Sequence, residues 1–499
     1  GHGTTLTTPL IKGSVYGGAE HGHNYTNATV NVYSGTIGIT EKIPGTSDDD
    51  PWWDFGSEEL NKEYYVDRGN VYGAGCGVDT YTDRKGNKHY NPKAGMVGGN
   101  TVVNIKGGHI GRSVYGAGSL ASVGNITNAR DTLDVSKGGT GTAKHANEAN
   151  GFALSWPYKF VFAPGTGKTT INVTGGHIGT ENVDGGDVFG GARGKVGDRY
   201  DMAHVAVVNE TEVNVDYDTP ASESDMPNIK TNFAISCVTG SVSGSGEDGY
   251  VYGDTHVTLN KGLIGHSLYG GGKGKSTYTK TLKTLDDSDE YPAKIYSLIA
   301  GKVLGNTYVT MNGGYVGRNV YGGGNMASVG KGNYAGGTDD YVNDNTISVV
   351  GYGEKTDGNL WDGVSEDSQA FLGSGKTTVN VISGTVGYID ESNPSNSMKN
   401  DLPYGNVIGG SAGEAASNVT KDPRYEYSPA FFSGYVNETD VTIGGYRCKT
   451  AYTDAGSKSH VVGDLMTAKD FEDVADADTA KWEIVGPTIR ASVYGGGQD

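Results

Sequence analysis

Carboxylates are the most abundant ionisable side chains in this sequence. The 499 residues include 58 Asp and Glu against 39 Lys and Arg, which gives a formal net charge of −19 at pH 7. Two aspartate runs offer the oxygen ligands that Ca²⁺ prefers. Neither has the spacing of a known calcium loop, and solvated surface charge explains both more simply. The candidate metal ligands are Asp48, Asp49, Asp50, Asp286, Asp287 and Asp289. We expect no cofactor, and Ca²⁺ is the one alternative that these residues leave open.

No residues stand out as a catalytic group. A pair of glycosidase carboxylates would lie about 5 to 9.5 Å apart, and the sequence singles out no such pair among its 58 acidic residues. The nucleophile-elbow signature of serine hydrolases is also absent from the sequence. We therefore predict a non-enzymatic protein with no catalytic residue.

The string PGTGKT, Pro164 to Thr169, is similar to a phosphate-binding loop. In such loops a glycine-rich backbone and a lysine surround the phosphates. Here Phe162 stands where the motif has its first glycine, and a strand is expected after the string. Without a following helix there is no helix N-terminus to hold an anion. We expect no nucleotide site.

Two histidines, His109 and His177, occupy one position of a recurring segment, between Gly-Gly and Ile-Gly. The other residues at this position are Thr36, Leu263, Tyr315 and Thr385. A metal ladder would need ligands in most copies. The variability instead predicts an outward-facing surface position.

An aromatic residue recurs at another position of the same segment. If the copies stack as strands about 4.8 Å apart, these rings form a column. Ile408 replaces the ring in one copy, which favours packing over a role for the hydroxyl, with a sugar-stacking platform as the alternative. The predicted ladder is Tyr16, Tyr72, Tyr115, Phe189, Tyr269, Tyr321 and Tyr494.

The element that must position these residues is the segment Thr101 to Gly118, TVVNIKGGHIGRSVYGAG. Val103 and Ile105 flank Asn104 in the alternation of a half-buried strand. The glycines that follow turn the chain, and Val114 and Tyr115 begin a second short strand. The segment has no helical period.

Copies of this segment recur from Ile11 to Gly497, which is the mark of a repeat architecture. The sequence predicts an all-β fold, a single elongated β-solenoid over residues 1–499 with the right-handed parallel β-helix as its favoured form. The predicted inward-facing core is Val103, Ile105, Ile110, Val114, Ile171, Val173, Val257, Leu259, Val309, Val379 and Val381. Asparagines that alternate with these core residues are predicted to face outward: Asn31, Asn104, Asn172, Asn214 and Asn380.

Insertions of different length interrupt the repeats, and a solenoid tolerates them because each coil contacts only its neighbours. They are expected near residues 39–69, 125–165, 216–234, 273–300, 331–374, 388–404 and 446–488. A short helix is expected between Asp464 and Ala480.

Charge and cysteine content restrict the partners. The acidic balance disfavours nucleic acid and anionic membranes, which need a basic surface. No apolar run approaches the roughly 20 residues of a membrane-spanning helix.

Cys76, Cys237 and Cys448 are expected to be isolated small buried residues, because three cysteines cannot all pair within the chain.

The repeat resembles the glycine-rich repeats of large bacterial cell-surface proteins, often described as adhesin-like. The resemblance rests on the V-x-V, GG-x-IG and VYGGG strings, followed by Ala-Ser-Val-Gly at Ala121 to Gly124 and at Ala327 to Gly330. It covers most of the chain. It implies a β-helix, export to the cell surface or exterior, and an adhesive or structural role, without any catalytic residue.

Three functions stay open at this point. The first is a structural protein of the cell exterior, a filament subunit or surface stalk. The second is an adhesin whose insertions bind a glycan or a host surface protein, and the third is a polysaccharide-degrading β-helix. We favour the first, with the chain itself as partner in a head-to-tail homopolymer. The sequence begins and finishes with the same half-repeat, Ile11 to Gly18 and Ile489 to Gly497. Either the chain is a fragment of a longer array, or its copies stack head to tail. We favour stacking, because head-to-tail contacts build filaments when they do not close.

Overall fold

The computed structural model describes most repeats and part of the insertions. Its described residues are 9–38, 68–77, 93–126, 162–180, 185–194, 206–274, 300–330, 375–388, 404–413, 436–474 and 479–496, with residues 84 and 434 and short strands at 81–82, 88–90, 133–134, 277–283, 290–296, 333–334 and 349–350. The predicted calcium ligands, Asp48 to Asp50 and Asp286 to Asp289, lie outside this part of the chain.

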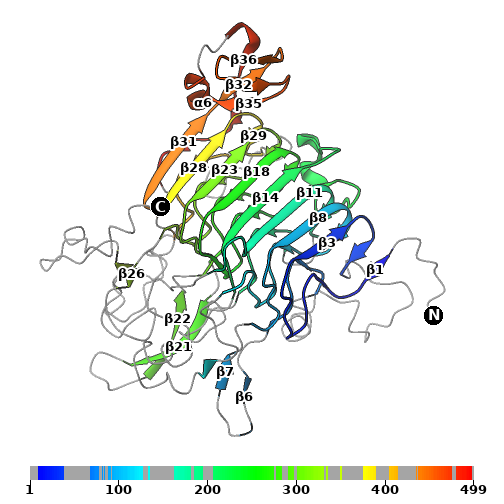
Figure 1. Ribbon diagram of the computed structural model, residues 1–499, viewed down its shortest axis with the longest axis vertical. Coiled ribbons are helices and arrows are strands. Elements are labelled where there is room, and N and C mark those ends of the chain that lie inside the picture. Colours follow the sequence, from blue (N-terminus) through cyan, green and yellow to red (C-terminus); the bar gives the residue numbers. More distant parts are fainter. Residues whose placement is uncertain are drawn as a thin grey trace, which may run out of the picture.

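Parallel β-strands form the two main sheets of the described structure. In the larger of two main sheets, which holds 15 strands of the described chain, the long strands lie side by side in chain order (Figure 1). These long strands are β3 (Ala28–Val32), β8 (Thr101–Ile110), β11 (Lys168–Ile178), β14 (Glu210–Asp216), β18 (Thr255–Lys261), β23 (Thr307–Met311), β28 (Lys376–Val381) and β31 (Glu438–Ile443). Short strands continue the same sheet: β1 (Leu10–Ile11), β4 (Thr36–Ile37), β15 (Cys237–Val238), β19 (Leu263–Ile264), β24 (Tyr315–Val316), β29 (Thr385–Val386) and β37 (Thr488–Ile489).

The second main sheet contains the aromatic position of each repeat. Its nine strands within the described residues also follow one another in chain order. They are β2 (Val15–Tyr16), β5 (Val71–Tyr72), β9 (Val114–Tyr115), β12 (Val188–Phe189), β16 (Val242–Ser243), β20 (Leu268–Tyr269), β25 (Val320–Tyr321), β30 (Val407–Ile408) and β38 (Val493–Tyr494).

Pairing between neighbouring repeats places like residues opposite one another. Val103 pairs with Val30 on one side and with Ile171 on the other, and Asn104 pairs with Asn31 and Asn172. All residues of the predicted core are buried, at 0 or 1 % exposure. The apolar alternation of each long strand therefore faces a shared interior.

The outward asparagines do more than contact solvent. The amide of Asn104 donates to Asn31 at 2.9 Å, Asn172 donates to Asn104 at 2.9 Å, and Asn214 donates to Asn172 at 3.1 Å. The sequence predicted the side on which these residues lie, but not that their side-chain amides would link successive repeats.

A buried threonine joins the two main sheets in six of the described repeats, and Ala28 stands at this position in β3. The Thr255 hydroxyl donates to the Gly270 carbonyl at 2.6 Å, and Thr307 bonds Gly322 in the same way. Both threonines are fully buried. Equivalent bonds link Thr101 to Gly116, Thr169 to Gly190, Thr211 to Gly244, and Thr377 to Gly409. Because each bond satisfies a buried hydroxyl, it stabilises the repeat by about 1 kcal/mol.

One insertion has its own small core. Residues expected to form an irregular insertion at 446–488 instead form an antiparallel sheet of β32 (Gly445–Cys448), β35 (Leu465–Thr467) and β36 (Trp482–Val485). The expected short helix is α6 (Ala468–Glu472). Phe471 packs with Cys448, Met466 and Trp482, so apolar residues that the repeat does not use make a separate cluster.

The remaining elements lie outside the two main sheets and the small antiparallel sheet. They are β6 (Tyr81–Thr82), β7 (Lys88–Tyr90), β10 (Leu133–Asp134), β13 (Val207–Val208), β17 (Tyr250–Val251), β21 (Thr277–Lys283), β22 (Glu290–Tyr296), β26 (Asn333–Tyr334), β27 (Val349–Val350), β33 (Tyr452–Thr453), β34 (Ser459–His460), and the 3₁₀ helices η4 (Glu223–Asn228) and η6 (Thr479–Lys481). No helix in the described residues is long and apolar enough to span a membrane.

The cysteines are unpaired, as expected. Cys237 and Cys448 are buried. The expectation of burial is wrong for Cys76, which is half-buried because it lies in isolated bridges to Glu20 and Ser119 rather than inside a long strand.

We expect Val103→Asp to destabilise the protein by roughly 4 kcal/mol or more, because it places an unpaired carboxylate in the buried core between repeats. Val102→Asp is the matched control: it changes the next residue of the same strand, which faces outward and is half-buried. Urea denaturation should show a much smaller loss for the control. Equal losses would mean that the two faces of the strand are misassigned.

Candidate functional site

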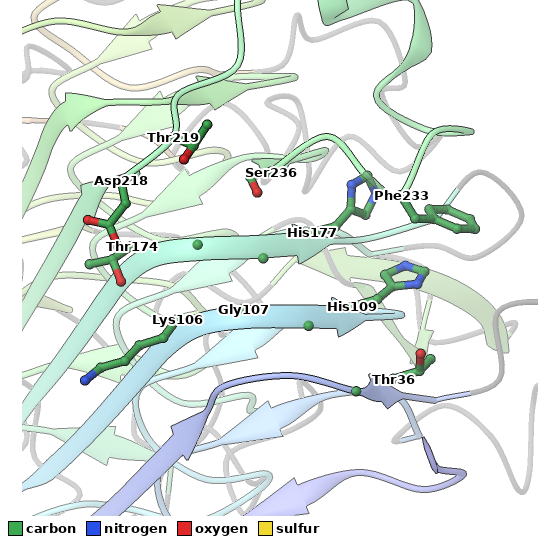
Figure 2. A pocket seen from close by; sticks show the side chains of 14 residues that line it. Thr36, Lys106, Gly107, His109, Thr174, His177, Asp218, Thr219, Phe233 and Ser236 are labelled. Carbon is green, nitrogen blue, oxygen red and sulfur yellow. The ribbon is translucent and has the colours of Figure 1, made fainter. Parts of the chain in front are cut away.

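A groove crosses the outer face of the larger sheet where β4, β8 and β11 end. Its floor is made largely of glycine, with Gly107 and Gly108 on β8 and Gly175 and Gly176 on β11. Its volume is about 560 Å³. Figure 2 shows Thr36, Lys106, His109, Thr174, His177, Asp218, Thr219, Phe233 and Ser236 around this floor.

The glycines are required by the close contact between repeats. A Cβ on Gly107 would lie 2.3 Å from the Tyr33 carbonyl oxygen, and one on Gly175 would lie 2.4 Å from the Lys106 carbonyl oxygen. The same contact leaves the outer surface flat and without side chains. The groove is thus a consequence of how the repeats stack, bordered by side chains on either side.

The insertion after β14 forms the wall of the groove. Residues 217–236 leave the larger sheet and return to it at β15, and Ile229 packs on Cys237 and Leu263. Phe233, 38 % exposed, stands at the end of this wall, as Figure 2 shows. Insertion and sheet together therefore enclose a site that neither would form alone.

The prediction that the histidine position faces an open surface is wrong for several repeats. His177 is 1 % exposed, and Cys237 and Leu263 at the same position are 0 % exposed. Their side chains leave the sheet outward, but Ile229 and Ile235 of the insertion cover them. Nothing local in the sequence indicates this contact.

The two histidines and Phe233 form an aromatic cluster. The His109 ring stacks on Phe233 with ring centres 4.2 Å apart, and the His177 ring meets both edge-on at 5.1 and 5.3 Å. His109 Nε2 donates to the Gly179 carbonyl at 3.1 Å, and His177 Nδ1 donates to the Ile235 carbonyl at 2.7 Å. Two directional bonds and one stacked ring hold the cluster in place.

Burial keeps this cluster neutral. It lowers the pKa of His109 to about 4, although the Gly179 carbonyl partly opposes the effect. Burial also lowers the pKa of His177. The described residues contain no group of three or more His, Cys, Asp or Glu that could hold a metal ion. The cluster suits an uncharged contact surface.

The residues of the phosphate-loop string have roles within the repeats. Pro164 and Gly165 form a turn, and Lys168 begins β11. Lys168 Nζ lies 2.6 Å from a Glu212 carboxylate oxygen of the next repeat, and Thr169 makes the buried bond to Gly190. The strand expected after this string is therefore confirmed.

The predicted aromatic ladder is present in two separate stacks. Tyr16, Tyr72, Tyr115 and Phe189 stack with ring centres 4.8, 4.8 and 5.2 Å apart. Tyr269 and Tyr321 stack at 4.9 Å. Ser243 lies between the two stacks, and the sequence analysis missed this repeat because its second half, SVSGSG, has serine in place of the aromatic residue. Tyr494 pairs with Ile408 rather than with an aromatic residue, and its side chain is 40 % exposed.

Comparisons with known proteins add no family to this description. No protein-family model matches the chain, and neither a curated protein nor a solved structure matches it significantly.

We expect acid to loosen the histidine cluster. Because the folded pKa of His109 is lowered to about 4, the unfolded chain binds more protons than the folded chain between about pH 6.5 and this value. The stability contribution of the neutral ring is therefore complete above about pH 6.5 and decreases as the pH falls toward 4.

The measurement is urea denaturation at pH 7.5 and pH 4.5. His109→Gln keeps a donor for Gly179 but does not titrate, so the variant should lose less stability on acidification than the wild-type protein. Identical losses would contradict a buried neutral His109.

Proposed function

We propose that the chain is a non-enzymatic β-solenoid, each repeat being one coil, and that it serves as a structural protein of the bacterial cell exterior. The parallel pairing of the long strands with their neighbours, in chain order, supports a rigid rod. The resemblance of the repeat to those of cell-surface proteins supports the location. A polysaccharide-degrading β-helix stays an alternative that no particular observation favours.

Within this proposal, the coil stack continues from one copy of the chain to the next. The observation that carries it is a difference at equivalent positions. Val407 and Ile408 are 0 % exposed, whereas Val493 and Tyr494, one coil further on, are 47 % and 40 % exposed. The outer edges of β31 and β38 have no strand partner in the described residues, and neither have those of β3 and β2 at the opposite side of the stack. β37 and β1 likewise end the larger sheet. All of these strands are parallel, so β37 and β38 of one copy can pair with β1 and β2 of another.

We expect the purified chain to form rods that lengthen with concentration. Light scattering and electron microscopy should detect them. Val493→Asp should suppress the rods without lowering the melting temperature by more than a few degrees, because Val493 is largely exposed within one chain. An equivalent change on the outward face, Thr258→Asp, is the control and should leave assembly intact. A chain that stays monomeric at all concentrations would contradict the filament.

A second function, glycan binding, is favoured by the groove. Its flat glycine floor lies beside the exposed ring of Phe233, and polar groups from Lys106, Thr174 and Asp218 stand around it. Sugar rings bind to surfaces of this kind through an aromatic face and a few hydrogen bonds. We propose that an adhesive contact, where the chain makes one, uses this groove.

A glycan array tests the adhesive function. Phe233→Ala should reduce binding of a retained glycan by roughly tenfold, since it removes the exposed stacking face. Tyr25→Ala, which removes an exposed ring outside the groove, should not change it. A glycan bound equally by both variants would place the contact elsewhere.

A further inference from the structure

The aromatic stack of the smaller sheet has a gap one residue wide. Ser243 pairs with Phe189 on one side and with Tyr269 on the other, so it occupies the position that an aromatic ring fills in the neighbouring repeats. Ser243 itself is buried, at 2 % exposure. Its small side chain leaves two aromatic rings facing each other across the space of a missing ring.

The gap has the size of one planar ring. Rings in adjacent repeats of this stack lie 4.8 to 5.2 Å apart and are inclined by 10 to 14°. Phe189 and Tyr269 are two repeats apart, so about twice the strand spacing of ~4.8 Å separates them. A ring placed between them would have an aromatic ring on each face, as Tyr72 has between Tyr16 and Tyr115.

A cavity of about 190 Å³ occupies this place, and Phe189, Ser243 and Tyr269 line it. Pockets for drug-sized ligands measure about 300 to 1,000 Å³, so this one has room for a single substituted ring. Lys273, Arg318 and Asp187 also line the cavity.

The charges around the cavity favour an anionic substituent. The Lys273 ammonium lies 3.0 Å from one carboxylate oxygen of Glu247 and 6.0 Å from the centre of the Phe189 ring. Glu247 is also bound by the Tyr115 hydroxyl at 2.5 Å, and Arg193 Nε lies 3.8 Å away. An Asp187 oxygen accepts from the Ser241 backbone at 2.6 Å. Both carboxylates are thus held by donors of the protein.

Arg318 supplies the remaining positive charge. Its guanidinium carbon lies 5.0 Å from the centre of the Tyr404 ring, a contact that orients the planar group. His266 also lines the cavity, and burial together with the positive charges of Arg318, Lys230 and Lys273 lowers its pKa to about 4. A guanidinium pairs best with a carboxylate.

We propose that the gap at Ser243 binds a small aromatic carboxylic acid, with its ring stacked between Phe189 and Tyr269 and its carboxylate facing Arg318. The stack supplies two aromatic faces in advance, so the ligand orders no new wall on binding. This site is separate from the groove at Phe233 and does not depend on the glycan-binding function.

The test is isothermal titration calorimetry of the full chain with 4-hydroxyphenylacetate. We expect binding by the wild-type protein. Tyramine, which has the same ring but a cationic group, and cyclohexylacetate, which has the anion but no planar ring, should each bind at least roughly tenfold more weakly. Failure of 4-hydroxyphenylacetate to bind, or equal binding of the three compounds, would overturn the proposal.

Ser243→Tyr is the decisive variant, because it fills the gap with the ring that the other repeats have. It should abolish binding of 4-hydroxyphenylacetate and raise the melting temperature, since it adds two stacked contacts. Phe233→Ala is the matched control and should bind as the wild-type protein does. If Ser243→Tyr fails to fold, Tyr269→Leu and Arg318→Met, which remove one wall and the charge, should each weaken binding at least roughly tenfold. Unchanged binding in these variants would also overturn the proposal.

Discussion

At one position of most described repeats, the backbone approaches the next repeat so closely that only glycine fits. This glycine follows the aromatic position of the smaller sheet. A Cβ on Gly116, Gly190, Gly244, Gly270 or Gly322 would lie 2.1 to 2.2 Å from the carbonyl oxygen of the equivalent glycine in the next repeat. The same carbonyls accept the buried threonine hydroxyls that join the two sheets. Stacking between repeats and closure within a repeat therefore depend on one column of atoms.

This constraint leaves the outer positions free to vary, and the functional features occur there. The insertion after β14 adds a wall over the outer sheet face, while β14 stays in register with β18 from Thr211 to Val215. Replacing an aromatic residue by Ser243 likewise leaves the register between β12, β16 and β20 intact. Repeats that keep their strand pairing can thus form a groove and a ring-sized gap at modest cost in stability.

The repeat itself could be predicted from the sequence, because strand alternation and glycine turns are local signals. Val103 and Ile105 were assigned to the core on that basis, and both are fully buried. The cover over His177 could not be predicted, because it depends on contacts of Ile229 and Ile235 that no local pattern encodes. The gap at Ser243 left a signal that was missed: Thr211 to Val215 lacked a second half, and GSVSGSG at Gly240 to Gly246 has the spacing of one. Thr255 and Gly270 both stand at recurring positions of the repeat. Their recurrence in the sequence does not reveal that the threonine hydroxyl donates to the glycine carbonyl.

The effect of one added methyl group at two equivalent glycines tests the central claim most directly. Gly270 has the next repeat 2.1 Å from its Cβ position, whereas Gly495 has no atom within 4 Å, and neither has a φ in the left-handed region. Alanine is therefore tolerated by the backbone conformation at both. In urea denaturation, Gly270→Ala should lower the free energy of unfolding by roughly 3 kcal/mol or more, and Gly495→Ala by less than about 1 kcal/mol. A Gly270→Ala protein as stable as the Gly495→Ala protein would contradict the account.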